Sequence, residues 1–394
     1  MERLLRSKRL YFNVMNIFKI TYFLQKGDKS LFSYPIEEEY AYMDSLGDPK
    51  NDIDRSYKQY LCQRFFMPMW KRPLLSVVSL FVAPFCTVYL LLKGFFIKFS
   101  SHSETIIEDK GMNEVIPDSL KRNYSLDSSA WHSGMGLSWR DVNYVFAHLI
   151  GWYDPYFILK SIVKIASYSA MITRHSPLSI IVNGEYSFCS SLLTDYCHSR
   201  NVEHINVMHG EKLRFIRDSF FHFDRCFVWD QYYVNLFIRQ KAEPTQFVVS
   251  IPESLNINIS EHYKPSAFAN YKYYLALYTE DELKSIVASM AFSEGEGKTV
   301  KYRPHPRYSD MILLKKYVPE DLIEMPSEVS IIDSVANLDS AIGSYTTVLL
   351  QAHLSGKNVL LDDVTYKERY GRLVEYGYIL SGNMNNVNKL SDKQ

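Results

Sequence analysis

Short apolar runs alternate with longer amphipathic stretches in the middle of the chain. The runs are SIIVN (179–183), HINVM (204–208), CFVW (226–229) and QFVVSI (246–251), and helix-like segments follow the first and the third. Strands that alternate with helices predict a parallel sheet, whose ligands bind beyond the carboxyl ends of the strands. We therefore expect Glu185, His209 and Asp230, each close behind one of these runs, to face a ligand.

A second unit of the same kind follows residues 253–270, which we interpret as a linker. Its predicted strands are 272–277, 299–302, 338–342 and 359–361, and its helices are 279–292 and 348–354. Two such units predict an α/β fold with a cleft between two domains. We divide the chain into an N-terminal region (1–150), the remainder of the first domain (151–262) and a second domain (263–394), and we interpret residues 100–145 as an irregular polar connector.

The N-terminal region contains two features that favour contact with a membrane. Residues 1–30 interleave aromatic side chains with seven Lys or Arg and two acids, a composition suited to an anionic leaflet or to an ordinary packed surface segment. Residues 73–92 form an uncharged apolar run with cations on both sides and Pro84 in the middle. Three readings stay open for this run: a re-entrant or interfacial hairpin bent at Pro84, a true span, and a buried helix pair.

Composition narrows the class of protein. The chain has 394 residues, 47% of them hydrophobic, with 44 basic and 44 acidic side chains. Global disorder is excluded, broad electrostatic binding of nucleic acid is not expected, and a mean hydropathy of −0.18 excludes a polytopic membrane protein. The five cysteines are scattered without a CxxC pair, so we expect reduced thiols in the cytoplasm and no zinc site.

The first candidate motif is the sequence RPHPR (303–307) after a predicted strand. Two prolines fix the backbone around His305, while Arg303 and Arg307 lie beside it. Arginine and histidine donors suit the phosphate of a leaving group, and a rigid turn with solvated arginines is the alternative.

The second motif, GSYTT (343–347), joins a predicted strand to a helix. Backbone N–H groups at a helix start bind anions, and the hydroxyls of Ser344, Thr346 and Thr347 add donors. An ordinary helix cap is the alternative interpretation.

Two further turns could supply a base. Glu280 and Asp281 lie in an acidic first helical turn, where they could deprotonate a hydroxyl or simply complement the helix dipole. His209 precedes Gly210 at the end of a predicted strand. It could act as a base, contact the acceptor, or be a structural histidine.

RPHPR followed by GSYTTVLLQAHLSGK resembles the GT-B type glycosyltransferases that build bacterial surface polysaccharides, most of all bacterial sialyltransferases and polysialyltransferases. The resemblance covers residues 175–365 and implies two Rossmann-like domains. It implies a base at Glu280 or Asp281, a phosphate contact at His305, and nucleotide contacts at Ser344, Thr346 and Thr347. The family's acidic motif ends in glycine, where this chain has Glu282. The His209-Gly210 turn also resembles capsule transferases and the glycerophosphate polymerases of teichoic acid synthesis.

The resemblance implies an inverting transferase that acts in capsule or lipopolysaccharide synthesis. No DxD sequence lies near the candidate site, so we expect a transfer that does not depend on a metal ion. The donor substrate would be a nucleotide sugar, and CMP-sialic acid is the first candidate. No bound cofactor is expected. The acceptor would be a glycan or a lipid-linked molecule. The alternatives are another nucleotide-sugar or CDP-glycerol-type transferase and a sugar-nucleotide epimerase of the same fold. We expect the protein in the cytoplasm, in peripheral or re-entrant contact with the inner membrane.

Overall fold

The computed structural model describes residues 32–393 except 109, 151–152 and 383. The basic, aromatic segment predicted to lie on a leaflet (1–30) falls outside the described residues.

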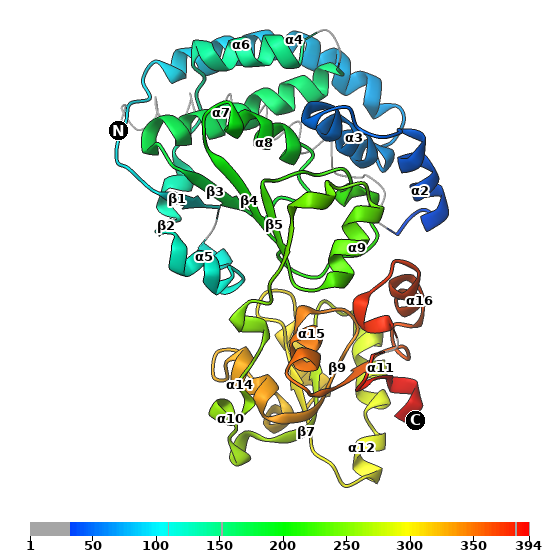
Figure 1. Ribbon diagram of the computed structural model, residues 1–394. Coiled ribbons are helices and arrows are strands. Elements are labelled where there is room, and N and C mark those ends of the chain that lie inside the picture. The colour runs from blue at the N-terminus through cyan, green and yellow to red at the C-terminus, as the bar shows by residue number, and fades with distance from the viewer. Residues whose placement is uncertain (1–31, 109, 151–152, 383, 394) are drawn as a thin grey trace, which may run out of the picture.

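The first domain is built on a parallel sheet of six strands in the order β2-β1-β3-β4-β5-β6 (Figure 1). The chain adds β2 on one side of β1 and β3 on the other, so the order reverses between β1 and β3. The strands are β1 (Thr105–Ile107), β2 (Leu126–Asp127), β3 (Ser179–Val182), β4 (Glu203–Val207), β5 (Arg225–Val228) and β6 (Phe247–Val249).

The second domain repeats this plan with five parallel strands in the order β11-β10-β9-β7-β8. Here the order reverses between β7 and β9. The strands are β7 (Ala269–Tyr274), β8 (Val300–Arg303), β9 (Leu338–Gly343), β10 (Asn358–Leu361) and β11 (Val387–Lys389). Two Rossmann-like domains in succession confirm the predicted α/β fold of the GT-B type.

Helices cover both sheets. The first domain has α2 (Ile36–Ser45), α3 (Asp52–Phe65), α4 (Lys71–Gly94), α5 (Asp118–Asn123), α6 (Trp139–His148), α7 (Pro155–His175), α8 (Ser190–His198) and α9 (Gln231–Arg239). The second has α10 (Ile259–His262), α11 (Glu280–Ser289), α12 (Phe292–Gly295), α13 (Met311–Tyr317), α14 (Ile331–Ala336), α15 (Thr347–Leu354) and α16 (Lys367–Glu375). The long helices α4 and α7 and the shorter α6 lie together on the far side of the first domain from the second (Figure 1).

Two sequence interpretations of the N-terminal region were wrong. Residues 100–145 are not an irregular connector, because they supply β1, β2, α5 and most of α6. The run 73–92 is not a hairpin bent at Pro84, because α4 is continuous through that residue. Proline deprives the carbonyl of Leu80 of its helical partner, and both residues lie on the exposed side of α4, where water or another donor can satisfy it.

The two domains touch through the segment after α16. Tyr376 packs its ring against Phe32 and Phe215 with centroids 5.2 and 5.1 Å apart, and its carbonyl accepts from the Arg214 N–H at 2.9 Å. The Tyr232 hydroxyl donates to the Gly377 carbonyl. The Tyr345 hydroxyl, beyond the end of β9, donates to the Glu211 carbonyl, beyond the end of β4, so the carboxyl ends of these two strands face each other.

Candidate active site between the two domains

The His-Pro turn follows β8 and is fixed to the loop that follows β7. The His305 N–H donates to the Ser309 hydroxyl at 2.8 Å, and that hydroxyl donates to the Ala276 carbonyl at 2.9 Å. The Tyr278 hydroxyl adds a bond to the Asp310 carbonyl at 2.7 Å. Both loops are thereby held at the carboxyl edge of the second sheet.

The His305 ring is held as a neutral hydrogen-bond donor. Its Nδ1 accepts from the Arg307 N–H at 3.1 Å, so the proton of the neutral imidazole is on Nε2. Burial and then the Arg307 charge lower the pKa of His305, and its ring stacks on Tyr308 with centroids 4.5 Å apart. An N–H group fixed in this way can donate to a phosphate oxygen without a change of protonation.

The two arginines of the motif have different environments. Arg303 is buried, bonds Glu324 at 2.8 Å and donates to the Val329 carbonyl at 2.8 Å. Glu324 is shared with Lys272, which lies 2.5 Å away. Arg307 is exposed, and no ion pair is found for it among the described residues. Arg303 is thus occupied within the core, and Arg307 is the guanidinium that a ligand can reach.

The turn 343–347 joins β9 to α15. The Ser344 hydroxyl oxygen is buried, and no hydrogen-bond partner is found for it among the described residues. Thr346 caps α15, accepting from the Val348 N–H at 3.5 Å, and Thr347 is the first residue of the helix. A Cβ on Gly343 would lie 3.2 Å from the Tyr274 carbonyl oxygen, so glycine lets β9 approach β7 at the point where the strand order reverses.

The structure brings His305 and the turn 343–347 to the same edge of one sheet. Strand β7 lies between β8 and β9, so the two turns are separated by two strand spacings, about 10 Å. A nucleotide whose phosphate lies between them can contact both.

The acidic turn 280–282 has a structural role at the start of α11, which was one of the two roles expected from the sequence. Thr279 and Glu282 form a reciprocal capping box at the start of α11. Glu280 points to α13, where Lys316 donates to it at 2.8 Å and the Tyr317 hydroxyl also donates. These bonds lower the pKa of Glu280 to about 2, so its carboxylate is a weak base. Asp281 has a side chain 97% exposed and lies 3.6 Å from Lys284.

The His209 turn of the first domain meets the turn 343–347 of the second domain. His209 is exposed just beyond β4, and the Tyr345 hydroxyl donates to the Glu211 carbonyl at 3.2 Å. Burial raises the pKa of the Glu211 side chain well above its usual range, and its carboxyl oxygens are enclosed at this contact. Sequence reasoning did not select Glu211, because its burial depends on Tyr345 and Tyr378, which lie far along the chain.

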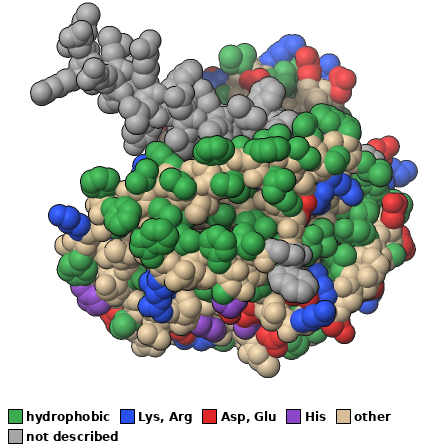
Figure 2. Space-filling model, turned by 90° about the horizontal axis from the view of Figure 1, so that it is seen from above, with side chains coloured by type: hydrophobic (Ala, Val, Ile, Leu, Met, Phe, Trp, Pro, Cys, Tyr) green, Lys and Arg blue, Asp and Glu red, His purple; other side chains and the backbone are tan. Residues whose placement is uncertain are grey.

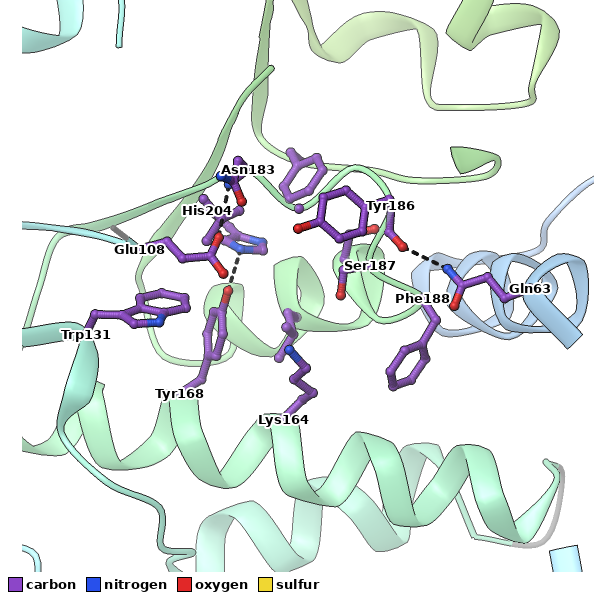
Figure 3. A pocket seen from close by; sticks show the side chains of 15 residues that line it. Gln63, Glu108, Trp131, Lys164, Tyr168, Asn183, Tyr186, Ser187, Phe188 and His204 are labelled. Carbon is purple, nitrogen blue, oxygen red and sulfur yellow. Dashed lines mark hydrogen bonds between the residues drawn. The ribbon is translucent and has the colours of Figure 1, made fainter. Parts of the chain in front are cut away.

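A cavity of about 230 Å³ lies at the other point where a strand order reverses, between β1 and β3 (Figure 3). Glu108 follows β1 and accepts from the Asn183 N–H, which follows β3, at 3.2 Å. Lys164 extends from α7 toward the cavity, and Trp131 forms part of its wall. The short strand β1 gave no signal in the sequence, so this site was also missed.

The cavity walls combine aromatic rings with fixed polar groups. Gln63 donates to the Tyr186 carbonyl at 2.8 Å, and the Tyr168 hydroxyl bonds His204 at 3.0 Å. Burial lowers the pKa of His204 to about 3, so this histidine is a neutral structural group. Such a lining suits a polar ring compound with hydroxyl groups.

Among the described residues, no group of three or more His, Cys, Asp or Glu side chains is placed to hold a metal ion.

No protein-family profile matches the sequence, and no curated protein matches it. Solved structures do. The wall teichoic acid polymerase TagF is 10% identical with a TM-score of 0.39, over 57% of this chain and 63% of that one. The UDP-GlcNAc 2-epimerase of Methanocaldococcus jannaschii is 12% identical with a TM-score of 0.42, over 73% and 88%. The glycotransferase of kitacinnamycin is 9% identical with a TM-score of 0.41, over 75% and 86%. This chain thus spans about three fifths of TagF.

Proposed function

We propose that the protein is a glycosyltransferase that moves a sugar from a nucleotide donor to a glycan or lipid-linked acceptor in bacterial surface polysaccharide synthesis. The observation that carries this proposal is that His305, with its proton on Nε2, and the buried Ser344 hydroxyl, which has no partner among the described residues, follow strands of one sheet at the same edge. Both groups can donate to a phosphate, and the start of α15 adds backbone N–H groups.

The reaction follows from this placement. A base takes the proton of an acceptor hydroxyl, and the oxygen attacks the anomeric carbon from the face opposite the phosphate. The bond between that carbon and the phosphate oxygen breaks, and its electron pair stays on the nucleotide phosphate. His305, Arg307 and the turn 343–347 stabilise this charge as it develops, so their contacts strengthen in the transition state.

The first donor to test is CMP-sialic acid, as the motif order suggests. In that reading the base is Asp281, because Glu280 is engaged by Lys316 and Tyr317. The acceptor binds the first domain, whose cavity between β1 and β3 is a candidate site for one of its sugars.

A second candidate is a CDP-glycerol-type transfer. The contact between Tyr345 and Glu211 favours it, because this contact holds the His209 turn beside the turn 343–347. In this reading His209 is the base.

A thermal-shift series with CMP, CDP, UDP and GDP tests the proposal. We expect a cytidine nucleotide to raise the melting temperature, and His305→Ala or Ser344→Ala to reduce that rise while the unliganded protein melts as before. Ile312→Ala, an exposed side chain on α13 just after the turn, is the control. Stabilisation by UDP alone would refute both cytidine readings, and no response to any of the four would refute the nucleotide site.

A further inference from the structure

Helix α4 is apolar on a side that the rest of the described chain leaves exposed. Its inner side buries Leu75, Ser79 and Leu90, whereas Phe85 on the opposite side is 79% exposed. Among the described residues it is the one helix long and apolar enough to cross a membrane, and 22% of its most apolar window is buried. A core helix of a soluble domain would be mostly covered.

The apolar side of α4 is part of a larger surface. The view onto the top of the first domain shows hydrophobic side chains gathered in rows over this region (Figure 2). The docking face, as we call it, consists of exposed residues from α4 and its N-cap, the segment after α4, and α6: Trp70, Leu74, Val77, Val78, Leu80, Phe81, Phe85, Val88, Leu92, Phe95, Phe96, Phe99, Trp139 and Phe146. A continuous patch of this kind marks an interaction site.

The fold holds α4 lengthwise against the first domain at two points. Near its start, the Ser76 hydroxyl donates to Asp154, the N-cap of α7, at 2.5 Å. Near its end, the Leu90 carbonyl accepts from the Leu137 N–H at 3.0 Å. A Cβ on Gly94 would lie 1.9 Å from the Leu137 carbonyl oxygen, so the two backbones are in direct contact. For α4 to cross a bilayer, these contacts would have to break or the folded domain would have to enter the lipid.

The charges around the docking face favour an anionic partner. Residues 65–103 contain four Lys or Arg and no Asp or Glu. Lys93 and Lys98 are exposed near the end of α4, where they can reach lipid headgroups. Tryptophan and phenylalanine beside such cations are typical of helices that lie in the membrane interface.

We propose that the docking face lies flat on an anionic lipid bilayer, with α4 and α6 parallel to the membrane plane and neither helix crossing it. Such binding would hold the first domain at the lipid surface. The cavity lined by α7 would then lie on the membrane side of the first sheet.

Flotation with vesicles tests the partner. We expect the protein to float with vesicles of phosphatidylcholine and phosphatidylglycerol and much less with phosphatidylcholine alone. Replacing Phe81 and Phe85 by serine should weaken the binding about tenfold or more, because each ring adds apolar contact with lipid. The control is Ile312→Ser, a side chain 87% exposed on α13 of the other domain, which should leave binding unchanged.

Two other results would overturn the proposal. If a second copy covers the docking face, light scattering will show a dimer that Phe81→Ser with Phe85→Ser dissociates, without vesicle binding. If α4 crosses the bilayer, tryptophans placed at Phe81 and Phe96 will be quenched by brominated lipids at depths differing by up to about 22 Å. A helix lying flat places both at the same shallow depth.

Discussion

The Tyr376 hydroxyl donates to the Glu39 carboxylate at 2.7 Å and joins α2, at the start of the described chain, to the end of α16 in the second domain. Both side chains lie in a contact made mostly of aromatic rings. The first described helix is therefore fixed to a segment of the second domain more than 300 residues away in the sequence.

This contact makes stability depend on pH. Burial raises the pKa of Glu39 from 4.5 to about 7, although the bond from Tyr376 opposes the shift. The folded protein therefore holds the proton more tightly than the unfolded chain, so the free energy of unfolding falls as the pH rises from about 4.5 to about 7. We expect Glu39→Gln to remove this slope and to stabilise the protein by about 1–2 kcal/mol at neutral pH.

Urea unfolding measured from pH 4 to pH 8 checks this prediction, with the exposed neighbour Glu38→Gln as the control. An unchanged slope in Glu39→Gln would show that another group causes the dependence.

Gly377 is required at the same domain contact. Its φ is +67°, and an added Cβ would lie 2.7 Å from both Arg214 Nε and Tyr232 Oη. We expect Gly377→Ala to cost about 2–3 kcal/mol, from backbone strain and from the displaced partners. Gly356→Ala is the matched control, because Gly356 also has a positive φ, +76°, but nothing within 4 Å of the added Cβ. Chemical unfolding of both variants measures the difference, and equal losses would mean that strain alone acts.

The sequence was enough to predict where most strands of the two sheets end. The short runs HINVM (204–208), TVKY (299–302) and LDSAI (338–342), each bounded by a turn, identified the strands that lead to His209, His305 and Ser344. Strands β1 and β2, of three and two residues, are too short to show any period.

Partners of side chains were harder to predict. Arg303 and Arg307 look equivalent in RPHPR, yet only Arg303 meets Glu324, a residue 21 positions away. No sequence pattern indicates which distant acid an arginine will bind in the folded chain. Likewise, the acidic turn revealed a helix start but not that Glu280 would be bonded by Lys316 and Tyr317 from another helix.

The two arginines give a third prediction. Arg303→Met should destabilise the protein by about 3 kcal/mol, because it breaks a buried pair and leaves the Val329 carbonyl without its donor. Arg307→Met should change stability by less than about 0.5 kcal/mol and reduce the thermal shift produced by a nucleotide. Unfolding and nucleotide titration of both variants measure these opposite patterns. The reverse pattern would place the phosphate contact at Arg303.

The last prediction concerns the base. Glu280→Gln should leave turnover within a few-fold of the wild type, because a carboxylate with a pKa of about 2 accepts protons poorly. If the donor is CMP-sialic acid and Asp281 is the base, Asp281→Asn should lower kcat by about 10²–10⁴ without changing donor binding. If the donor is of the CDP-glycerol type, His209→Ala should give that loss instead. Turnover and donor affinity of all three variants, measured with both donors, decide between them, and a loss confined to Glu280→Gln would refute both assignments.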